Sequence, residues 1–188
     1  MKHIYLNLKR FDFPREMGGV NSIAPVKEWG AYIVENTKKA LAEYGEDEVE
    51  FVMYLPEAHL LSAAGAMDGS RNLAIGSQGI HREDVKAGGN FGAFTANRTG
   101  KAVKALGCSS VLIGHCEERR DKLGIMAEAG AGDTDAVNRI LNQEVRAAVE
   151  AGLTVLYCIG ESEEEQERWQ EVLRKQLEIA LKDVDTSK

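Results

Sequence analysis

The stretch AVNRILNQEVRAAVEAGLTVLYCIG, residues 136–160, decides the fold class of this chain of 188 residues. Its first part carries apolar residues at helical spacing, and Gly152 follows as a stop. The segment 153–159 is then short and almost continuously apolar, which is typical of a strand covered on both faces. A helix that leads at once into such a strand predicts an α/β protein with a parallel sheet.

The same alternation recurs from one end of the chain to the other. Five βα units of roughly 37 residues fit the sequence, and no linker suggests a second domain, so we expect one domain over residues 1–188. A capping box of Ser162 and Glu165 precedes the last helix. Strands are predicted over residues 3–7, 49–54, 72–76, 110–114 and 153–159, and helices over 25–44, 98–106, 137–149 and 169–181.

Composition narrows the classes of function. The chain is 44% hydrophobic and 28% charged with a net charge of -7, which indicates a globular protein and argues against binding to nucleic acid. No apolar stretch approaches the roughly 18 to 20 residues of a membrane span, and the first residues lack a signal peptide. We therefore expect a cytoplasmic protein with neither a nucleic-acid nor a membrane partner.

Three cysteines, Cys108, Cys116 and Cys158, form no even framework and are expected to be free thiols. His115 precedes Cys116, but the sequence has no CxxC and no paired-ligand spacing, so no metal site is predicted.

Polar residues stand at the ends of three predicted strands. Lys9 follows the first strand and could hold a phosphate or an oxyanion, although a solvated lysine is the simpler interpretation. His115 follows the fourth strand, where a helix start would keep its ring neutral and able to donate to a carbonyl, although a lone histidine is more often structural. The acidic run 163–167 after the fifth strand is interpreted as a helix start.

Four motifs together resemble the triosephosphate isomerase family, whose members carry N-x-K, GAFTGE, GHSERR and CIGE after strands one, three, four and five. The resemblance runs from residue 3 to about 182 and implies a (β/α)8 TIM barrel with its site at the C-terminal ends of the strands. About five of its βα units are represented in this chain. The matching stretches are Asn7-Leu8-Lys9, GAFTAN at 92–97, GHCEERR at 114–120 and CIGE at 158–161.

The resemblance implies a role for each matched residue. His115 is similar to the neutral electrophile that polarises the substrate carbonyl, Lys9 to the cation that binds the substrate phosphate and stabilises the enediolate, and Asn7 to its neighbour in the substrate pocket. Glu117 resembles the carboxylate that pairs with Lys9. Thr95 resembles the loop residue that enters a partner subunit, which implies a homodimer. The substrate would be a small phosphorylated sugar, isomerised without cofactor or metal.

Departures from the family pattern keep alternatives open. The family's base is a glutamate after strand six, and neither this glutamate nor the glycine-rich phosphate loops after strands seven and eight have a match, so a C-terminally incomplete barrel is expected. GHCEERR has one residue too many, which leaves the register of its arginines open. Besides interconversion of dihydroxyacetone phosphate and glyceraldehyde 3-phosphate, the sequence allows a tetrulose phosphate isomerase or a non-catalytic barrel piece. A generic flavodoxin-like domain does not explain the motifs together.

Overall fold

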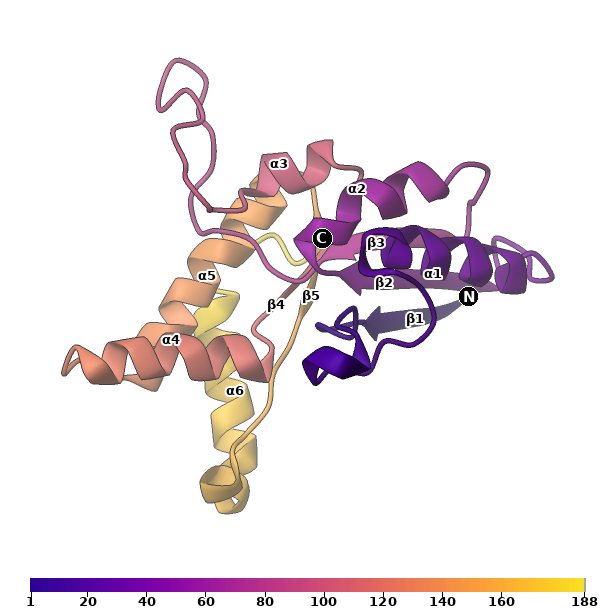
Figure 1. Cartoon of the computed structure of the whole chain (residues 1–188). Helices are drawn as coiled ribbons and strands as arrows, with labels where there is room; N and C mark the ends of the chain where they lie inside the picture. Colours follow the sequence, from indigo (N-terminus) through magenta and orange to yellow (C-terminus); the bar gives the residue numbers. More distant parts are fainter. Residues whose placement is uncertain (188) are drawn as a thin grey trace. The chain divides into compact units, whose positions relative to one another are not determined.

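The structure, a computed structural model, describes residues 1–187 as parallel strands that alternate with helices (Figure 1). The strands follow one another in the sheet in chain order, β1-β2-β3-β4-β5. This arrangement is a partial (β/α) barrel, and it confirms the predicted fold class. The strands are β1 (Lys2–Asn7), β2 (Val49–Leu55), β3 (Leu73–Ser77), β4 (Ser110–Ile113) and β5 (Thr154–Tyr157).

The chain divides into two compact units. The first unit comprises residues 1–78 and 102–111, and the second comprises residues 79–101 and those from 112 onward. The predicted single domain over residues 1–188 stays a prediction. The helices are α1 (Val26–Leu41), α2 (Glu57–Ala66), α3 (Gly100–Ala105), α4 (Cys116–Glu128), α5 (Thr134–Glu150) and α6 (Trp169–Ala180), with short 3-10 helices η1 (Arg15–Met17) and η2 (Glu163–Arg168).

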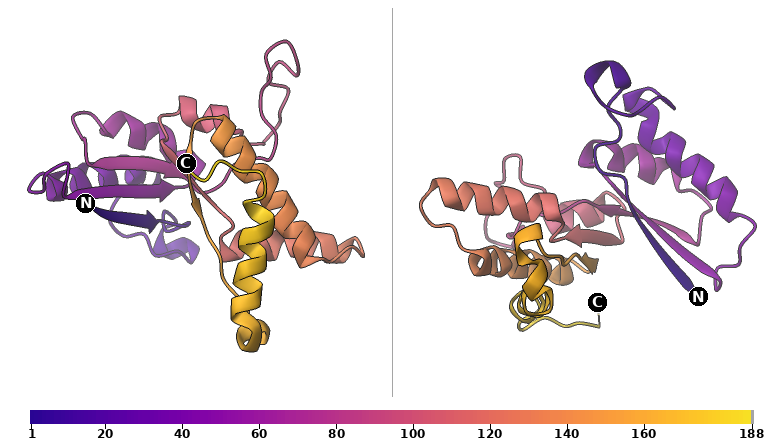
Figure 2. Two further views of the ribbon diagram at one scale, coloured as in Figure 1. Left: turned by 180° about the vertical axis from the view of Figure 1, so that it is seen from behind. Right: turned by 90° about the horizontal axis from the view of Figure 1, so that it is seen from below.

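In the first unit, α1 and α2 lie side by side against the strands (Figure 2). The two helices approach closely at Gly30, where a Cβ atom would come within 2.8 Å of the His59 Cβ. A similar constraint acts in the sheet, because a Cβ at Gly76 would lie 2.6 Å from the ring of Tyr54. The Tyr54 hydroxyl and Ser110 Oγ are hydrogen bonded at 2.8 Å. Glycine at these positions therefore permits the close packing of the layer.

In the second unit, α5 packs against α6 and β5. The α5 helix confirms the predicted amphipathic helix and extends it to Thr134, with the Asp133 carboxylate accepting from the Asp135 N–H as its cap. Gly152 has φ 75, as a left-handed turn from helix to strand requires. The capping box of Ser162 and Glu165 is present and starts η2. Cys158 N donates to Ile113 O at 2.8 Å, which aligns the ends of β4 and β5.

Several sequence predictions of the elements were wrong. The helix predicted over 25–44 ends at Leu41, and the expected stop Gly45 instead donates its N–H to Glu48 Oε2 in the turn before β2. The α2 helix was missed, since no helix was predicted between the strands at 49–54 and 72–76. The predicted helix start at His115 is present, but the length of α4 was not predicted because the helix buries no residue and so has no apolar stripe. Strand β1 is not covered on both faces, since Ile4, Tyr5 and Leu6 are about 41–42% exposed.

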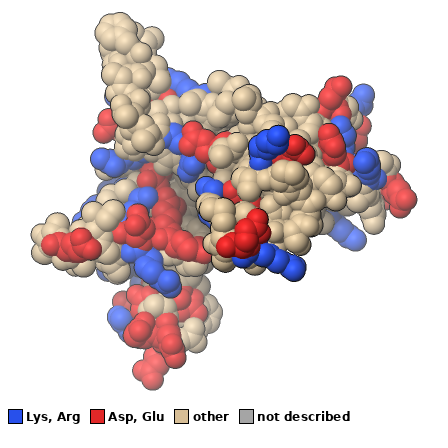
Figure 3. All heavy atoms as spheres, in the orientation of Figure 1, with Lys and Arg blue, Asp and Glu red and all other residues tan. Residues whose placement is uncertain are grey.

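The surface carries both signs of charge. Acidic and basic side chains are interspersed over the face drawn in Figure 3. Within residues 1–187, no helix is both long and apolar enough to cross a membrane.

Candidate functional site

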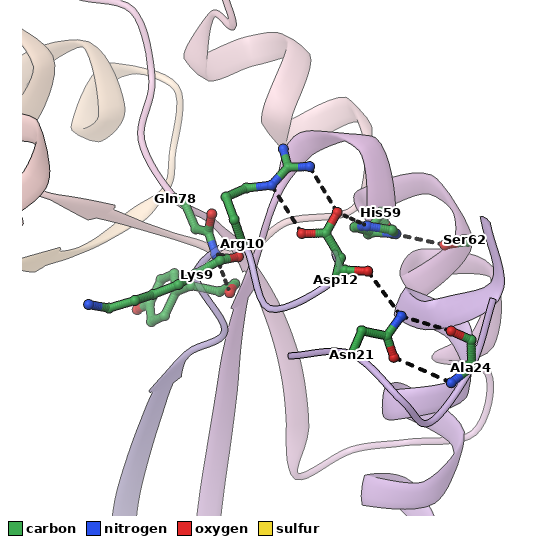
Figure 4. A network of polar contacts seen from close by, with 9 residues as sticks. Lys9, Arg10, Asp12, Asn21, Ala24, His59, Ser62 and Gln78 are labelled. Carbon is green, nitrogen blue, oxygen red and sulfur yellow. Dashed lines mark hydrogen bonds and ion pairs between the residues drawn. The ribbon is translucent and has the colours of Figure 1, made fainter. Parts of the chain in front are cut away.

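Lys9 lies directly after β1 in the first unit, with its backbone in the left-handed region at φ 45. This conformation is uncommon for a residue with a Cβ and costs about 1 kcal/mol or more. Asn7 stabilises it by accepting the Lys9 N–H at its Oδ1 atom, at 2.9 Å. Gln78, after β3, donates its amide to Lys9 O at 3.0 Å and to Asn7 Oδ1 at 3.2 Å (Figure 4). The predicted residues Asn7 and Lys9 are thus brought together, and Gln78 holds them.

A buried ionic network fixes the loop after Lys9 (Figure 4). The Asp12 carboxylate is 1% exposed and accepts from Arg10 at 2.8 and 3.0 Å, while its Oδ2 lies 3.0 Å from His59 Nε2 on α2. Burial alone would raise the pKa of Asp12, but the hydrogen bonds from His59 and Arg10 lower it below its usual range. Asn21 Nδ2 donates to Asp12 O and to Ala24 O. The segment that carries Lys9 is therefore anchored on α2.

His115 lies at the start of α4 in the second unit, after Gly114 with φ 85. Its ring contacts the Glu117 carboxylate through Nδ1, and Cys116 Sγ donates to Glu117 Oε2 at 3.0 Å. The His115 side chain is 26% exposed and that of Glu117 is 56% exposed. The structure therefore brings His115 and Glu117 together, while the pairing of Glu117 with Lys9 stays a prediction.

Arg119 connects the ends of β4 and β5. Its guanidinium donates to Gly114 O at 2.6 Å and to Cys158 O at 2.9 Å. It also donates to Asn138 Oδ1 and to the Tyr157 hydroxyl, both at 2.8 Å. Sequence reasoning left the register of the two arginines open, and the structure assigns this role to the first of them.

A second buried cluster joins α4 to α5. Lys122 Nζ lies 2.8 Å from Glu118 Oε1 and 3.0 Å from Glu144 Oε1. Burial, together with the Glu118 charge, raises the pKa of Glu144 to about 8. Burial would also raise the pKa of Glu118, but its bonds to Glu144 and Lys122 lower it. Lys122 thus pairs with two carboxylates, one from each helix. Nothing in the sequence indicated this cluster, because α4 shows no amphipathic pattern.

A cavity of about 610 Å³ opens beside His115 within the second unit. Its volume suits a small ligand. Polar side chains of both charges line it, among them Arg120, Glu161, Arg168 and Lys175. Lys175 is paired with Asp135 at 2.8 Å. The predicted loop residue Thr95 is exposed in the segment between β3 and α3, and its contact with a partner subunit stays a prediction.

A family model described as triosephosphate isomerase matches residues 26–188. The chain belongs to the triosephosphate isomerase family. It is 35% identical over 136 residues to the triosephosphate isomerase of Geobacter metallireducens and 31% identical over 154 residues to that of Clostridium novyi. These matches cover 71% and 81% of this chain but only 47% and 53% of the relatives, so the chain spans about half the length of these curated relatives.

A solved structure shares the fold. The triosephosphate isomerase of Bartonella henselae superposes with a TM-score of 0.66 at 25% identity, over 96% of this chain and 62% of that chain. Against the family motif GHSERR, this member of the triosephosphate isomerase family has Cys116 in place of serine.

Proposed function

We propose that the protein takes part in an aldose-ketose isomerisation, the interconversion of dihydroxyacetone phosphate and D-glyceraldehyde 3-phosphate by proton transfer through an enediolate. One observation carries the proposal: in a member of this family, Lys9 follows β1 after Leu8, and His115 follows β4 after Gly114. The C-terminal ends of barrel strands are the positions where such proteins hold their reacting groups. The substrate is a small phosphorylated sugar.

Each residue supplies one part of the chemistry. Lys9 carries the positive charge that attracts the phosphate and offsets the negative charge of the enediolate, and Asn7 holds its backbone. His115 polarises the carbonyl as a neutral imidazole, which is the known electrophile of triosephosphate isomerases. This role requires a proton on Nε2 and none on Nδ1. The pairing of Glu117, whose carboxylate contacts Nδ1 here, with Lys9 belongs to the same proposal.

The proton itself needs a base. The family's glutamate after strand six has no match among the 188 residues, and Glu161, Glu163, Glu164 and Glu165 all belong to the segment after β5. Proposed turnover therefore requires that glutamate from a segment beyond these residues. A homodimer, with Thr95 at the subunit contact, belongs to the same proposal.

Kinetics of the full-length protein test the proposal. Replacement His115→Gln is expected to lower kcat/KM for dihydroxyacetone phosphate by at least about 100-fold, mainly through kcat, because a transition-state donor is lost. Lys9→Met is expected to lower kcat and raise KM together. The exposed Arg15→Gln serves as the matched control and should leave both unchanged. Normal turnover in His115→Gln would show that the electrophile is assigned wrongly.

A tetrulose phosphate is the second candidate substrate. Inserts between Met17 and Pro25, between Ile80 and Phe91, and between Asp121 and Asp133 depart from the family pattern, and such loops reshape the mouth of a barrel. The ratio of kcat/KM for the three-carbon and four-carbon phosphates decides between them.

A non-catalytic role is the third candidate. The exposed apolar side chains of β1 favour pairing with a further strand or chain. Oligomers without turnover would support this role, and a monodisperse monomer would count against it.

A further inference from the structure

Three electron-pair donors of different chemistry converge at the start of α4. The His115 Nδ1, Cys116 Sγ and Glu117 carboxylate atoms all lie within 4.8 Å of one another. Sγ is 3.4 Å from Nδ1 and 3.0 Å from Glu117 Oε2, and Nδ1 contacts Oε2. Among residues 1–187, this is the one group of three or more histidine, cysteine and acidic side chains that converges in this way.

We propose that His115, Cys116 and Glu117 bind a thiophilic divalent cation such as Zn²⁺ or Co²⁺, with water in the fourth position. Imidazole, thiolate and carboxylate are all ligands that zinc accepts in proteins, and three protein ligands with one open position form a recognised class of zinc site.

One of the three distances between the ligand atoms already suits a tetrahedral ion. Zinc bonds of about 2.3 Å to sulfur and 2.0 to 2.2 Å to nitrogen and oxygen place the ligand atoms about 3.4 to 3.6 Å apart at tetrahedral angles. The 3.4 Å between Cys116 Sγ and His115 Nδ1 already falls in this range. The contact of Glu117 with Nδ1 is too close for both atoms to bind one ion, so the carboxylate must turn outward by about 1.4 Å on this geometry. Its side chain is half exposed and has room to turn.

The charges also balance. A thiolate and a carboxylate together offset the two charges of the cation, and Glu118 adds a further acid in the first turn of α4. These acids offset the helix dipole, which opposes a cation at a helix start. On binding, the Cys116 thiol proton and any proton shared by His115 Nδ1 and Glu117 pass to solvent. The cation then occupies the position between His115 Nδ1 and Glu117, and the imidazole keeps its proton on Nε2.

The sequence pattern concealed this site because its ligands are consecutive and lack the usual spacing of ligand pairs. Cys116 stands where the family motif has serine, so the soft ligand is a property of this chain. His115 and Cys116 line the cavity of about 610 Å³, and Cys158 lines it too. Cys158 therefore provides a second thiol at the same cavity for comparison.

Titration of the purified protein with Co²⁺, without substrate, tests the proposal independently of the proposed function. We expect one Co²⁺ per chain and a thiolate-to-cobalt charge-transfer absorption that Zn²⁺ abolishes by competition. Cys116→Ser is expected to remove this absorption and to weaken binding by more than about 100-fold, and Glu117→Gln by at least about 10-fold. Cys158→Ser should keep the absorption and bind within about threefold of the native affinity.

Circular dichroism of each variant confirms that it folds, and Glu117→Gln changes an exposed side chain in case Cys116→Ser does not fold. Native affinity in both Cys116→Ser and Glu117→Gln would overturn the proposal. The same holds if Cys158→Ser, rather than Cys116→Ser, loses the absorption, or if the native protein binds no Co²⁺.

Discussion

The polar cluster around Lys9 and the polar cluster around His115 are built in different ways. The groups that hold the Lys9 segment, Asp12, His59 and Gln78, come from separate parts of the chain, and the first two are buried. The contacts around His115 join neighbours in sequence at a helix start, and the side chains of Cys116 and Glu117 are exposed.

This difference indicates what each cluster depends on. The conformation of Lys9 depends on tertiary packing, so it should fail when a buried charge of that packing is removed. The position of His115 depends on Gly114 and on the guanidinium of Arg119 beneath it, rather than on the contacts of its own ring. Variants that remove each support separately test this contrast.

The largest effect is expected from Arg119→Met. Two carbonyls, an amide oxygen and a hydroxyl lose their donor together, which should lower the free energy of unfolding by about 3 to 5 kcal/mol. Chemical denaturation measures the change. Arg120→Met, an exposed neighbour of equal size, is the control and should stay within about 0.5 kcal/mol. Equal stability of the two variants would mean that Arg119 does not support the His115 segment.

Asp12→Asn should have the next largest effect and lower the free energy of unfolding by about 2 to 3 kcal/mol at pH 7, because Arg10 loses its buried charge partner and His59 its hydrogen-bond partner. Since folding lowers the pKa of Asp12, its stabilisation is present above the unfolded pKa and is lost as pH falls through the folded one. The difference in free energy of unfolding between Asp12→Asn and the native protein should therefore become smaller below about pH 4. Thermal or urea unfolding at pH 7 and pH 3 measures it.

Arg10→Gln is the matched control for this network. The Arg10 side chain is 56% exposed, so its loss should cost less than about 1 kcal/mol. If Asp12→Asn lowers the free energy of unfolding by the same amount at pH 7 and pH 3, packing and not charge holds the network.

Periodicity and helix caps predicted much of the fold. The amphipathic stripe of α5, the turn at Gly152 and the capping box at Ser162 are local features, and each has the form that the sequence indicated. The α4 helix was not predictable in this way, because it buries none of its own residues and is held by polar contacts of Glu118, Arg119 and Lys122.

In the candidate site, too, local features were predicted and contacts between distant parts of the chain were not. Lys9 and His115 were found because each follows a strand in a recognisable motif. Their supports were missed because the pairing of Asp12 with His59 spans 47 residues, and the contact of Gln78 with Lys9 spans 69. Such contacts form only when the chain packs, and no spacing in the sequence marks them.

The smallest effect at neutral pH is expected from Glu144→Gln. The pKa of Glu144 is raised to about 8, so this residue is protonated below that pH, and glutamine replaces it with a neutral side chain of the same size. Stability at pH 6 should then change by less than about 1 kcal/mol. Because folding raises this pKa, the native protein binds a proton that the unfolded chain releases above about pH 4.5, and it loses stability as pH rises toward 8. The variant lacks that proton and should become the more stable protein at pH 9. Urea unfolding from pH 5 to pH 9 measures both profiles, and parallel profiles would mean that Glu144 is ionised in the fold and that Lys122 alone joins α4 to α5.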